Sequence, residues 1–562
     1  MQNKARLLIL IFIFLIAFIL RFYKLGEVPF GFYQDESAIG YNAYSIIETG
    51  KDEYGENLPL YFKSFGDYKL PVYIYLDTIP IKLFGLNEFA VRFPSAFFGF
   101  LSVVVFYFFV KEFTRDKNLS LVAVGLFALN PWSLHYNRAT FEVSISLFLF
   151  LLGGLILQKA FNGGSKGKFA SGTLLFIISL YSYNLTRLLS PAFYLLLLIL
   201  NIKKIKNISK TEIIITSFIS VVMLVPFVKT LLASGGISSA SGTLIFSSAS
   251  VLAPMIELRS YFVDVPLSKF FFNTPELIFI KYLQNIISYF SPAFFFISGS
   301  SHGNHGIGNI GQLYLFEFPL VILGLIKIVK EKSSKYNLFI FWALIVIMAA
   351  SLTREAPHAT RSFFLISSLE VFSALGVLIL INWAKSIKPS FLKIGISLIF
   401  VGFLFYNLIY YFYSYYVRFP IYYAKAWRLA DKEVSLYIKE NEHKYSKIIF
   451  DSKAGFMYSS LLFYSRFNPS EFQGTVQRLP DDSEGFSKVQ SFGKYEFKDI
   501  DWSSYDKPGE KVLYVTTTEG KPLEVPPLKA VYYPKKPVVF SLGQEIIQFP
   551  IEEIAYVLVE KK

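Results

Sequence analysis

The sequence predicts a polytopic α-helical membrane protein that ends in a small α/β domain. Of its 562 residues, 53% are hydrophobic and 18% are aromatic, which is too apolar for a soluble globular protein. Apolar runs of about 15 to 25 residues, the length of a membrane-crossing helix, recur up to residue 415. Beyond that point the composition becomes mixed and polar. We therefore expect a membrane domain over residues 1–416 and an α/β domain over residues 417–562.

The apolar runs predict about eleven spans, because a transmembrane helix needs about 20 mostly apolar residues. The first covers roughly residues 7–20. The others fall at roughly 91–110, 118–134, 141–159, 168–183, 187–202, 211–230, 312–329, 337–353, 360–383 and 392–415. These spans leave a first loop at about 21–90 and a long loop at about 231–311.

The distribution of basic residues predicts which side each loop faces. Lys4 and Arg6 precede the first span, so the positive-inside rule places the N-terminus in the cytoplasm. Five later loops on the same predicted side are also basic. Their residues are Lys111, Arg115 and Lys117; Lys159, Lys166 and Lys168; Lys203, Lys204, Lys206 and Lys210; Lys327, Lys330, Lys332 and Lys335; and Lys385, Lys388 and Lys393. The first loop, the long loop and the C-terminal domain then face outward from a cytoplasmic membrane.

The same distribution accounts for the formal net charge of +14, so this charge does not indicate binding to nucleic acid. Much of the excess basicity lies in short loops between spans, where it sets topology and contacts anionic membrane lipid. Within the first loop, residues 70–84 are amphipathic and contain Pro80, which favours a helix lying at the interface. In the C-terminal domain, a helical pattern over residues 423–442 and strand-like residues 447–450 and 511–516 indicate an α/β arrangement.

Two adjacent carboxylates, Asp35 and Glu36, follow the first span on the predicted outer side. Carboxylates beside a membrane are costly to desolvate, so their placement indicates a functional site. The alternative is that they simply begin a helix, where acidic residues interact favourably with the helix dipole.

Further polar side chains are predicted on the same outer side. They are Lys69, Arg138, Glu142, Asn184, Arg187, His302, His305, Glu317, His358 and Arg361. Moving a group off a phosphate requires a base for the incoming hydroxyl and cations for the departing phosphate. Asp35 as the base, with Lys69, Arg187, His358 or Arg361 near the phosphate, would meet both needs.

Three stretches of the first loop resemble the signature of GT-C glycosyltransferases. They are residues 33–37 (YQDES), 67–73 (DYKLPVY) and 84–95 (FGLNEFAVRFPS). The similarity is greatest to the group of protein O-mannosyltransferases and lipid A aminoarabinose transferases, the glycosyltransferase family 39-like group.

Later motifs are similar to those of the same group and occur in the expected order. Residues 137–143 (NRATFEV) resemble its acidic motif after the third span. Segments common in its bacterial members follow, and they match residues 301–306 (SHGNHG), 313–319 (LYLFEFP) and 357–362 (PHATRS). The resemblance covers roughly residues 1–415. The C-terminal domain does not resemble the carbohydrate-binding module of mannosyltransferases.

The resemblance implies a transferase that uses a polyprenyl-phosphate-linked sugar as donor. It implies that Asp35 is the base, that Glu36 shapes the pocket, and that Lys69 and an arginine contact the lipid phosphate. Glu142 falls where relatives often carry aspartate, and we group it with the catalytic candidates. The substrate-binding candidates are Lys69, Arg138, Arg187, His302, His305, His358 and Arg361.

Structural roles remain open for most of these residues. Lys69 could extend its amine to the interface, and Arg138 and Glu142 have the spacing of a helical surface pair. Arg187 and Arg361 could anchor the ends of spans. The absence of cysteine excludes disulfides and thiolate ligands. His302 and His305 would need a carboxylate partner to bind metal, so we assign no metal ligand while leaving a divalent metal open.

We therefore expect an inverting, outward-facing GT-C glycosyltransferase. It would move a monosaccharide, a hexose or a pentose, from polyprenyl phosphate to a hydroxyl of a protein, lipid or polysaccharide. One rival is a transporter or flippase of lipid-linked sugars, which would favour charged residues deep within spans. An outward-facing ligase that transfers a whole glycan is a second rival. A non-catalytic scaffold would leave Asp35 and Glu36 unexplained.

Overall fold

The computed structural model divides the chain into two compact units. The first, which we call the helical unit, comprises Met1–Tyr23 and Ser95–Tyr411. The second, the sheet unit, comprises Lys24–Pro94 and Phe412–Lys562. The structure describes residues 2–65, 67–163, 166–232, 244–247, 253, 256–257, 259–262, 265–271, 273–387, 390–452, 457–480, 487–505, 509–542 and 545–561. Parts of the predicted long loop, including residues 233–243, lie outside these ranges.

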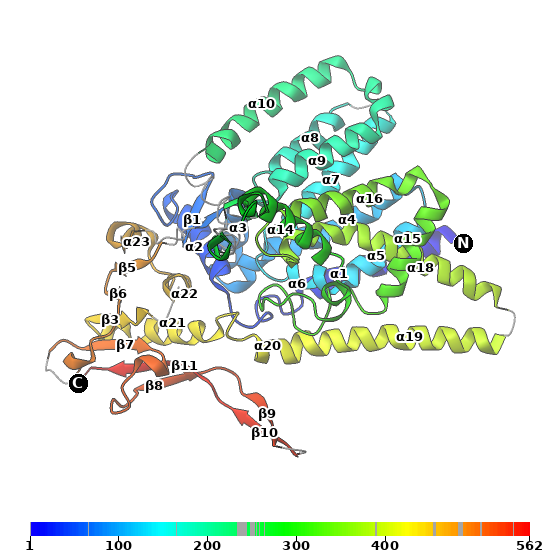
Figure 1. The fold of residues 1–562 in the computed structure, drawn as a ribbon. Helices are drawn as coiled ribbons and strands as arrows, with labels where there is room; N and C mark the ends of the chain where they lie inside the picture. Colours follow the sequence, from blue (N-terminus) through cyan, green and yellow to red (C-terminus); the bar gives the residue numbers. More distant parts are fainter. Residues whose placement is uncertain are drawn as a thin grey trace. The chain divides into compact units, whose positions relative to one another are not determined.

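Helices account for most of the helical unit (Figure 1). They are α1 (Gln2–Phe22), α4 (Glu88–Thr114, which begins in the sheet unit), α5 (Lys117–Leu129), α6 (Pro131–Tyr136), α7 (Val143–Asn162), α8 (Lys168–Ser179), α9 (Thr186–Leu200), α10 (Lys210–Leu232), α13 (Ser268–Phe271), α14 (Thr274–Ser288), α15 (Glu317–Glu331), α16 (Asn337–Ser351), α17 (Ala359–Ser362), α18 (Ile366–Ser386) and α19 (Ser390–Tyr413). Each of the eleven predicted spans contains one of these helices.

Seven helices in the described part of the chain are long and apolar enough to cross a membrane. The helices in the other four predicted spans, α5, α8, α9 and α15, have 12 to 15 residues and are shorter than the apolar runs suggested. For α5 the reason is local: Asn130 accepts a hydrogen bond from the Ser133 amide and Pro131 starts a new helix. The chain is therefore a multi-pass helical membrane protein, and several of its apolar runs contain breaks.

Helices α15 and α18 pack closely through two glycines. A Cβ atom added at Gly324 would lie 2.0 Å from the Phe372 carbonyl oxygen, and one added at Gly376 would lie 2.2 Å from that of Leu320. No other residue type leaves room for these backbone contacts. Small residues commonly allow such close helix crossings in membranes.

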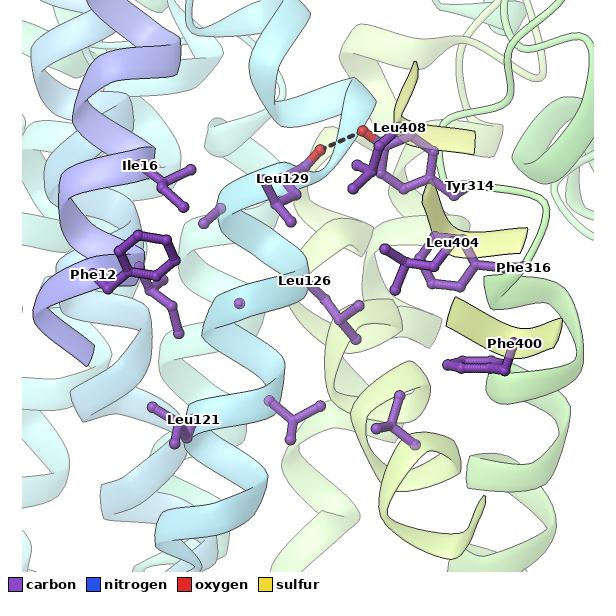
Figure 2. A pocket seen from close by; sticks show the side chains of 15 residues that line it. Phe12, Ile16, Leu121, Leu126, Leu129, Tyr314, Phe316, Phe400, Leu404 and Leu408 are labelled. Atoms are coloured by element: carbon purple, nitrogen blue, oxygen red, sulfur yellow. Dashed lines mark hydrogen bonds between the residues drawn. The ribbon is translucent and has the colours of Figure 1, made fainter. Parts of the chain in front are cut away.

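A cavity of about 310 Å³ lies among α1, α5 and α19 (Figure 2). Apolar side chains such as Phe12, Leu126 and Leu404 form almost all of its lining. The Tyr314 hydroxyl also lines it, but this group donates a 2.7 Å hydrogen bond to the Leu129 carbonyl oxygen. The cavity therefore offers little to a polar substrate.

The sheet unit contains a seven-stranded sheet with the order β4-β5-β6-β3-β7-β11-β8. Its strands are β3 (Lys447–Phe450), β4 (Gln477–Arg478), β5 (Val489–Phe492), β6 (Tyr495–Phe497), β7 (Val512–Thr516), β8 (Lys529–Tyr532) and β11 (Ile554–Glu560). Strand β3 runs parallel to both β6 and β7, and the other pairs are antiparallel. Two separate hairpins are formed by β1 (Phe62–Ser64) with β2 (Asp67–Lys69) and by β9 (Lys536–Leu542) with β10 (Glu545–Ile551).

The first loop contributes to the core of this unit. Two helices of the sheet unit come from this loop, α2 (Gln34–Thr49) and α3 (Pro71–Phe84). The others come from the C-terminal region and are α20 (Phe419–Tyr422), α21 (Leu429–Asn441), α22 (Met457–Ser465) and α23 (Pro469–Thr475). Ala38 and Tyr41 of α2 pack in the same buried cluster as Leu461 of α22 and Leu513 of β7. Residues 24–94 therefore belong to the same compact unit as the C-terminal α/β region. The α/β character predicted for that region is confirmed.

Candidate active site

Asp35 and Glu36 lie in the first turn of α2. This helix is fixed against α22 in two ways. Gly40 faces Phe463 so closely that an added Cβ would lie 2.8 Å from the ring, and the Ser37 hydroxyl donates a 2.9 Å hydrogen bond to the Ser459 hydroxyl. Asp35 and Glu36 therefore do begin a helix, as the alternative to a functional site proposed. Contacts with α22 hold that helix in place.

Asp35 forms an ion pair with Lys69. The Lys69 amine donates to Asp35 Oδ1 at 2.6 Å, and Lys69 follows the β1–β2 turn at the end of β2. The Lys69 side chain is 7% exposed, whereas that of Asp35 is 39% exposed. The pair thus holds Asp35 in place while leaving its carboxylate accessible to an incoming group.

Glu36 forms an ion pair with Arg92, a residue to which the sequence analysis gave no role. Arg92 Nε and Nη2 donate to Glu36 Oε1 and Oε2, both at 2.9 Å, and both side chains are fully buried. Arg92 also donates to the carbonyl oxygens of Pro29 at 2.9 Å and Gly31 at 2.7 Å. Glu36 therefore holds Arg92, and through it the segment leading to α2, rather than offering a free carboxylate.

Asp77 of α3 is a third acidic residue near this pair, and the sequence analysis did not single it out. Its side chain is fully buried, and neither carboxylate oxygen has a hydrogen-bond partner among the described residues. Burial, and secondarily the charge of Glu36, raises the pKa of Asp77 well above its ordinary value. The signal in the sequence was a lone acidic residue within the apolar stretch 70–84.

The raised pKa predicts how Asp77 affects stability. Above about pH 4 the unfolded chain loses a proton that the folded protein retains, so wild-type stability falls as the pH rises. Asp77→Asn carries no such proton. We expect thermal unfolding at several pH values to show that the stability of the variant rises relative to that of wild type as the pH increases above about 4, by up to roughly 1.4 kcal/mol per pH unit. A constant difference across that range would contradict a protonated Asp77.

In the helical unit, four predicted substrate-binding residues come together. The His305 ring centroid lies 4.8 Å from that of His358 and 6.0 Å from that of His302. The Glu355 carboxylate lies 3.7 Å from both His358 Nε2 and Arg361 Nη2. Burial, with the nearby charge of Arg361, lowers the pKa of His358 far below its ordinary value, so this imidazole is neutral at physiological pH. Arg361 therefore supplies a positive charge beside a neutral His358.

The loop that carries His302 and His305 is tied down by neighbouring elements. Thr360 Oγ1 and His305 Nδ1 share a 3.1 Å hydrogen bond, and His135 Nε2 lies 2.9 Å from the Asn304 carbonyl oxygen. Burial lowers the pKa of His135 to about 4, so it too is neutral. In the described part of the chain, no group of three or more His, Cys, Asp or Glu residues has an arrangement that could hold a metal ion.

Arg138 and Glu142 occupy different surroundings. Arg138 is buried, and its Nη1 donates to the Leu20 carbonyl oxygen at 2.7 Å, at the end of α1. Glu142 is the residue immediately before α7. Glu142 and Arg361 both interact electrostatically with Tyr183, which relates Glu142 to the histidine cluster. Arg138 instead supports the backbone of the first helix.

Arg187 lines a cavity of about 640 Å³ among α8, α9 and α10. Its guanidinium carbon lies 5.7 Å from the Phe227 ring centroid. The hydroxyls of Ser190 and Thr216 also line this cavity, and most of the remaining lining is aromatic or aliphatic. The cavity thus combines one guanidinium with a large apolar surface.

Comparison with known proteins supplies the family context. A family model described as dolichyl-phosphate-mannose-protein mannosyltransferase matches residues 11–234. No curated protein sequence matches the chain at a significant level.

Several solved structures share the fold. ArnT from Cupriavidus metallidurans in the apo state has a TM-score of 0.52 at 10% identity, covering 100% of this chain and 99% of that chain. The same protein bound to undecaprenyl phosphate gives 0.50 at 10% identity, covering 98% of each chain.

A third structure is the archaeal oligosaccharyltransferase AglB from Archaeoglobus fulgidus, in complex with an inhibitory peptide and a dolichol-phosphate. It gives a TM-score of 0.50 at 14% identity and covers 83% of this chain, which spans only 64% of AglB. Together these matches show that the chain has the GT-C fold, and they confirm the resemblance of its N-terminal part to the mannosyltransferase group.

Proposed function

We propose that this protein is a glycosyltransferase that moves a monosaccharide from polyprenyl phosphate to an acceptor hydroxyl at the outer face of the membrane. The observation that carries the proposal is the Asp35–Lys69 pair, an accessible carboxylate fixed by a buried amine at the start of a rigid helix. The family match and the GT-C fold support transfer of a lipid-linked sugar.

The donor class follows from two further observations. The similar ArnT structure was determined with undecaprenyl phosphate bound. In this chain, the cavity that Arg187 lines offers apolar surface for an isoprenoid chain and a cation for a phosphate. We propose that the donor lipid occupies this cavity.

The reaction we propose is a single in-line displacement. Asp35 accepts the proton of the acceptor hydroxyl while the hydroxyl oxygen bonds to the anomeric carbon. The bond between that carbon and the phosphate oxygen breaks, and its electron pair leaves with the lipid phosphate. One attack from the opposite face inverts the configuration. A cation would stabilise the departing phosphate, and Arg187, which lines the cavity proposed for the donor lipid, is a candidate for that role.

Reconstituted full-length protein tests this function. We expect release of free polyprenyl phosphate when a radiolabelled polyprenyl-phosphate monosaccharide and an acceptor are both present, and none from a nucleotide sugar. A panel of hexosyl and pentosyl donors would identify the sugar. Movement of intact donor across the bilayer without cleavage would instead support a flippase, and turnover of only a lipid diphosphate glycan would support a ligase.

A further inference from the structure

A polar cavity of about 430 Å³ lies within the sheet unit, away from the residues discussed so far. It is formed by the segment before α21, the turn after β7 and the start of β11. Its volume is within the range of about 300–1,000 Å³ that is usual for small-ligand sites. Unlike the two apolar cavities described above, it is lined largely by charged, hydroxyl and tyrosine side chains.

Arg428 gives this cavity a donor without a partner. Its Nε donates to Asp431 Oδ2 at 2.6 Å, but its buried Nη2 has no hydrogen-bond partner among the described residues. Asp431 is itself fixed, because it accepts hydrogen bonds from the Ser460 hydroxyl at 3.0 Å and the Tyr556 hydroxyl at 2.8 Å. A buried donor of this kind is costly to leave unpaired, and a ligand oxygen would satisfy it.

Most charges around the cavity already pair with one another, Lys425 with Glu553 at 3.3 Å and Arg428 with Asp431 at 2.6 Å, which leaves little demand for a charged ligand. Two cationic side chains, Lys425 and Arg428, are outnumbered by three acidic ones, Asp431, Glu519 and Glu553. This balance disfavours a phosphate or a carboxylate. The cavity instead offers hydrogen-bond donors and acceptors together with tyrosine rings, which matches the alternating hydroxyls and apolar faces of a sugar.

The cavity is connected by packing to the candidate catalytic residue. Trp427, next to Arg428 in the chain, stacks edge-on against Tyr33 with ring centroids 5.4 Å apart. The Arg92 guanidinium carbon lies 5.9 Å from the same Trp427 ring. Tyr33 precedes Asp35 by two residues, and Arg92 holds Glu36. The cavity therefore lies beside a residue that packs against the segment carrying Asp35.

We propose that this cavity binds an uncharged saccharide of the acceptor, so that the enzyme glycosylates a glycan or a glycoconjugate. The assignment as acceptor rests on the proposed function, whereas the binding of a neutral saccharide does not. Binding the acceptor away from the reacting hydroxyl would supply energy for orienting it.

Binding of the full-length protein to an array of neutral and acidic oligosaccharides tests the site. We expect binding to neutral glycans that weakens about tenfold in Glu519→Gln, equivalent to one lost hydrogen bond to a charged group. Glu524→Gln, an exposed glutamate five residues away that does not line the cavity, is the matched control and should bind like wild type. Arg428→Met should also weaken binding. If this change at a buried position impairs folding, Glu519→Gln still tests the site.

The outcomes separate this proposal from the proposed function. Binding of acidic glycans only, no binding, or equal binding by Glu519→Gln and wild type would each overturn the saccharide site. With the bound glycan as acceptor, Glu519→Gln should raise its KM about tenfold and leave donor binding unchanged. If the glycan binds as expected but receives no sugar while another acceptor does, the acceptor assignment is wrong. If no donor is turned over at all, the proposed function fails and the binding site stands.

Discussion

Arg92→Met is expected to destabilise the sheet unit by about 3–5 kcal/mol, the usual cost of removing one partner of a buried ion pair. The variant would leave the Glu36 carboxylate fully buried without its two Arg92 donors. It would also remove the donors to the Pro29 and Gly31 carbonyl oxygens, which fix the segment before α2. Thermal unfolding of the detergent-solubilised protein, followed by tryptophan fluorescence, measures the effect.

A double-mutant cycle distinguishes the pair from general damage to packing. Arg92→Met combined with Glu36→Gln should cost less than the sum of the single changes, by about 1–3 kcal/mol, because the buried charge disappears with its partner. The control is Lys498→Met, which removes an exposed partner of Glu496 and should cost about 0–1 kcal/mol. Additive effects, or a loss in Arg92→Met no greater than in Lys498→Met, would show that the pair does not hold this segment.

The membrane architecture could be predicted because apolar length is a local signal. Each predicted span contains a helix, and the family motifs of the first loop identified the GT-C fold. The ends of the helices were harder to predict, since a capping residue such as Asn130 interrupts an apolar run without changing its composition. The position of Asp35 just after the first span could also be predicted, because it depends only on the order of residues along the chain.

Tertiary partners could not be predicted in the same way. Arg92 lies 56 residues from Glu36, and nothing local distinguishes it from an arginine that anchors a span. Likewise, Ala38 and Tyr41 gave no sign that α2 would pack in the core of a sheet more than 400 residues later. Asp77 was more accessible to sequence reasoning, because an isolated carboxylate in an apolar helix is itself unusual.

Asp35→Asn is expected to lower the rate of sugar transfer by about 10²–10⁴-fold, the usual contribution of a positioned general base. The substitution keeps the size of the side chain and an oxygen that can accept the Lys69 hydrogen bond, so α2 should stay in place. An amide cannot take the proton of the acceptor hydroxyl at neutral pH. The loss should therefore appear in kcat, with the donor Kd and thermal stability close to those of wild type.

Two further variants show whether the loss belongs to Asp35. Glu56→Gln changes an exposed acidic residue of the same loop and should leave transfer unchanged. Asp35→Glu keeps a carboxylate but moves it by one methylene, so it should recover part of the lost rate. If Glu56→Gln lost as much activity as Asp35→Asn, the effect would belong to the charge of the loop and not to Asp35.

The most direct measurement is the single-turnover rate of sugar transfer by Asp35→Asn with donor and acceptor both saturating. If Asp35 removes the acceptor proton, this rate falls at least about 100-fold while the amount of bound donor stays the same. A variant that binds donor equally well and transfers sugar at the wild-type rate would show that the proton goes elsewhere, and Asp35 could not be the base.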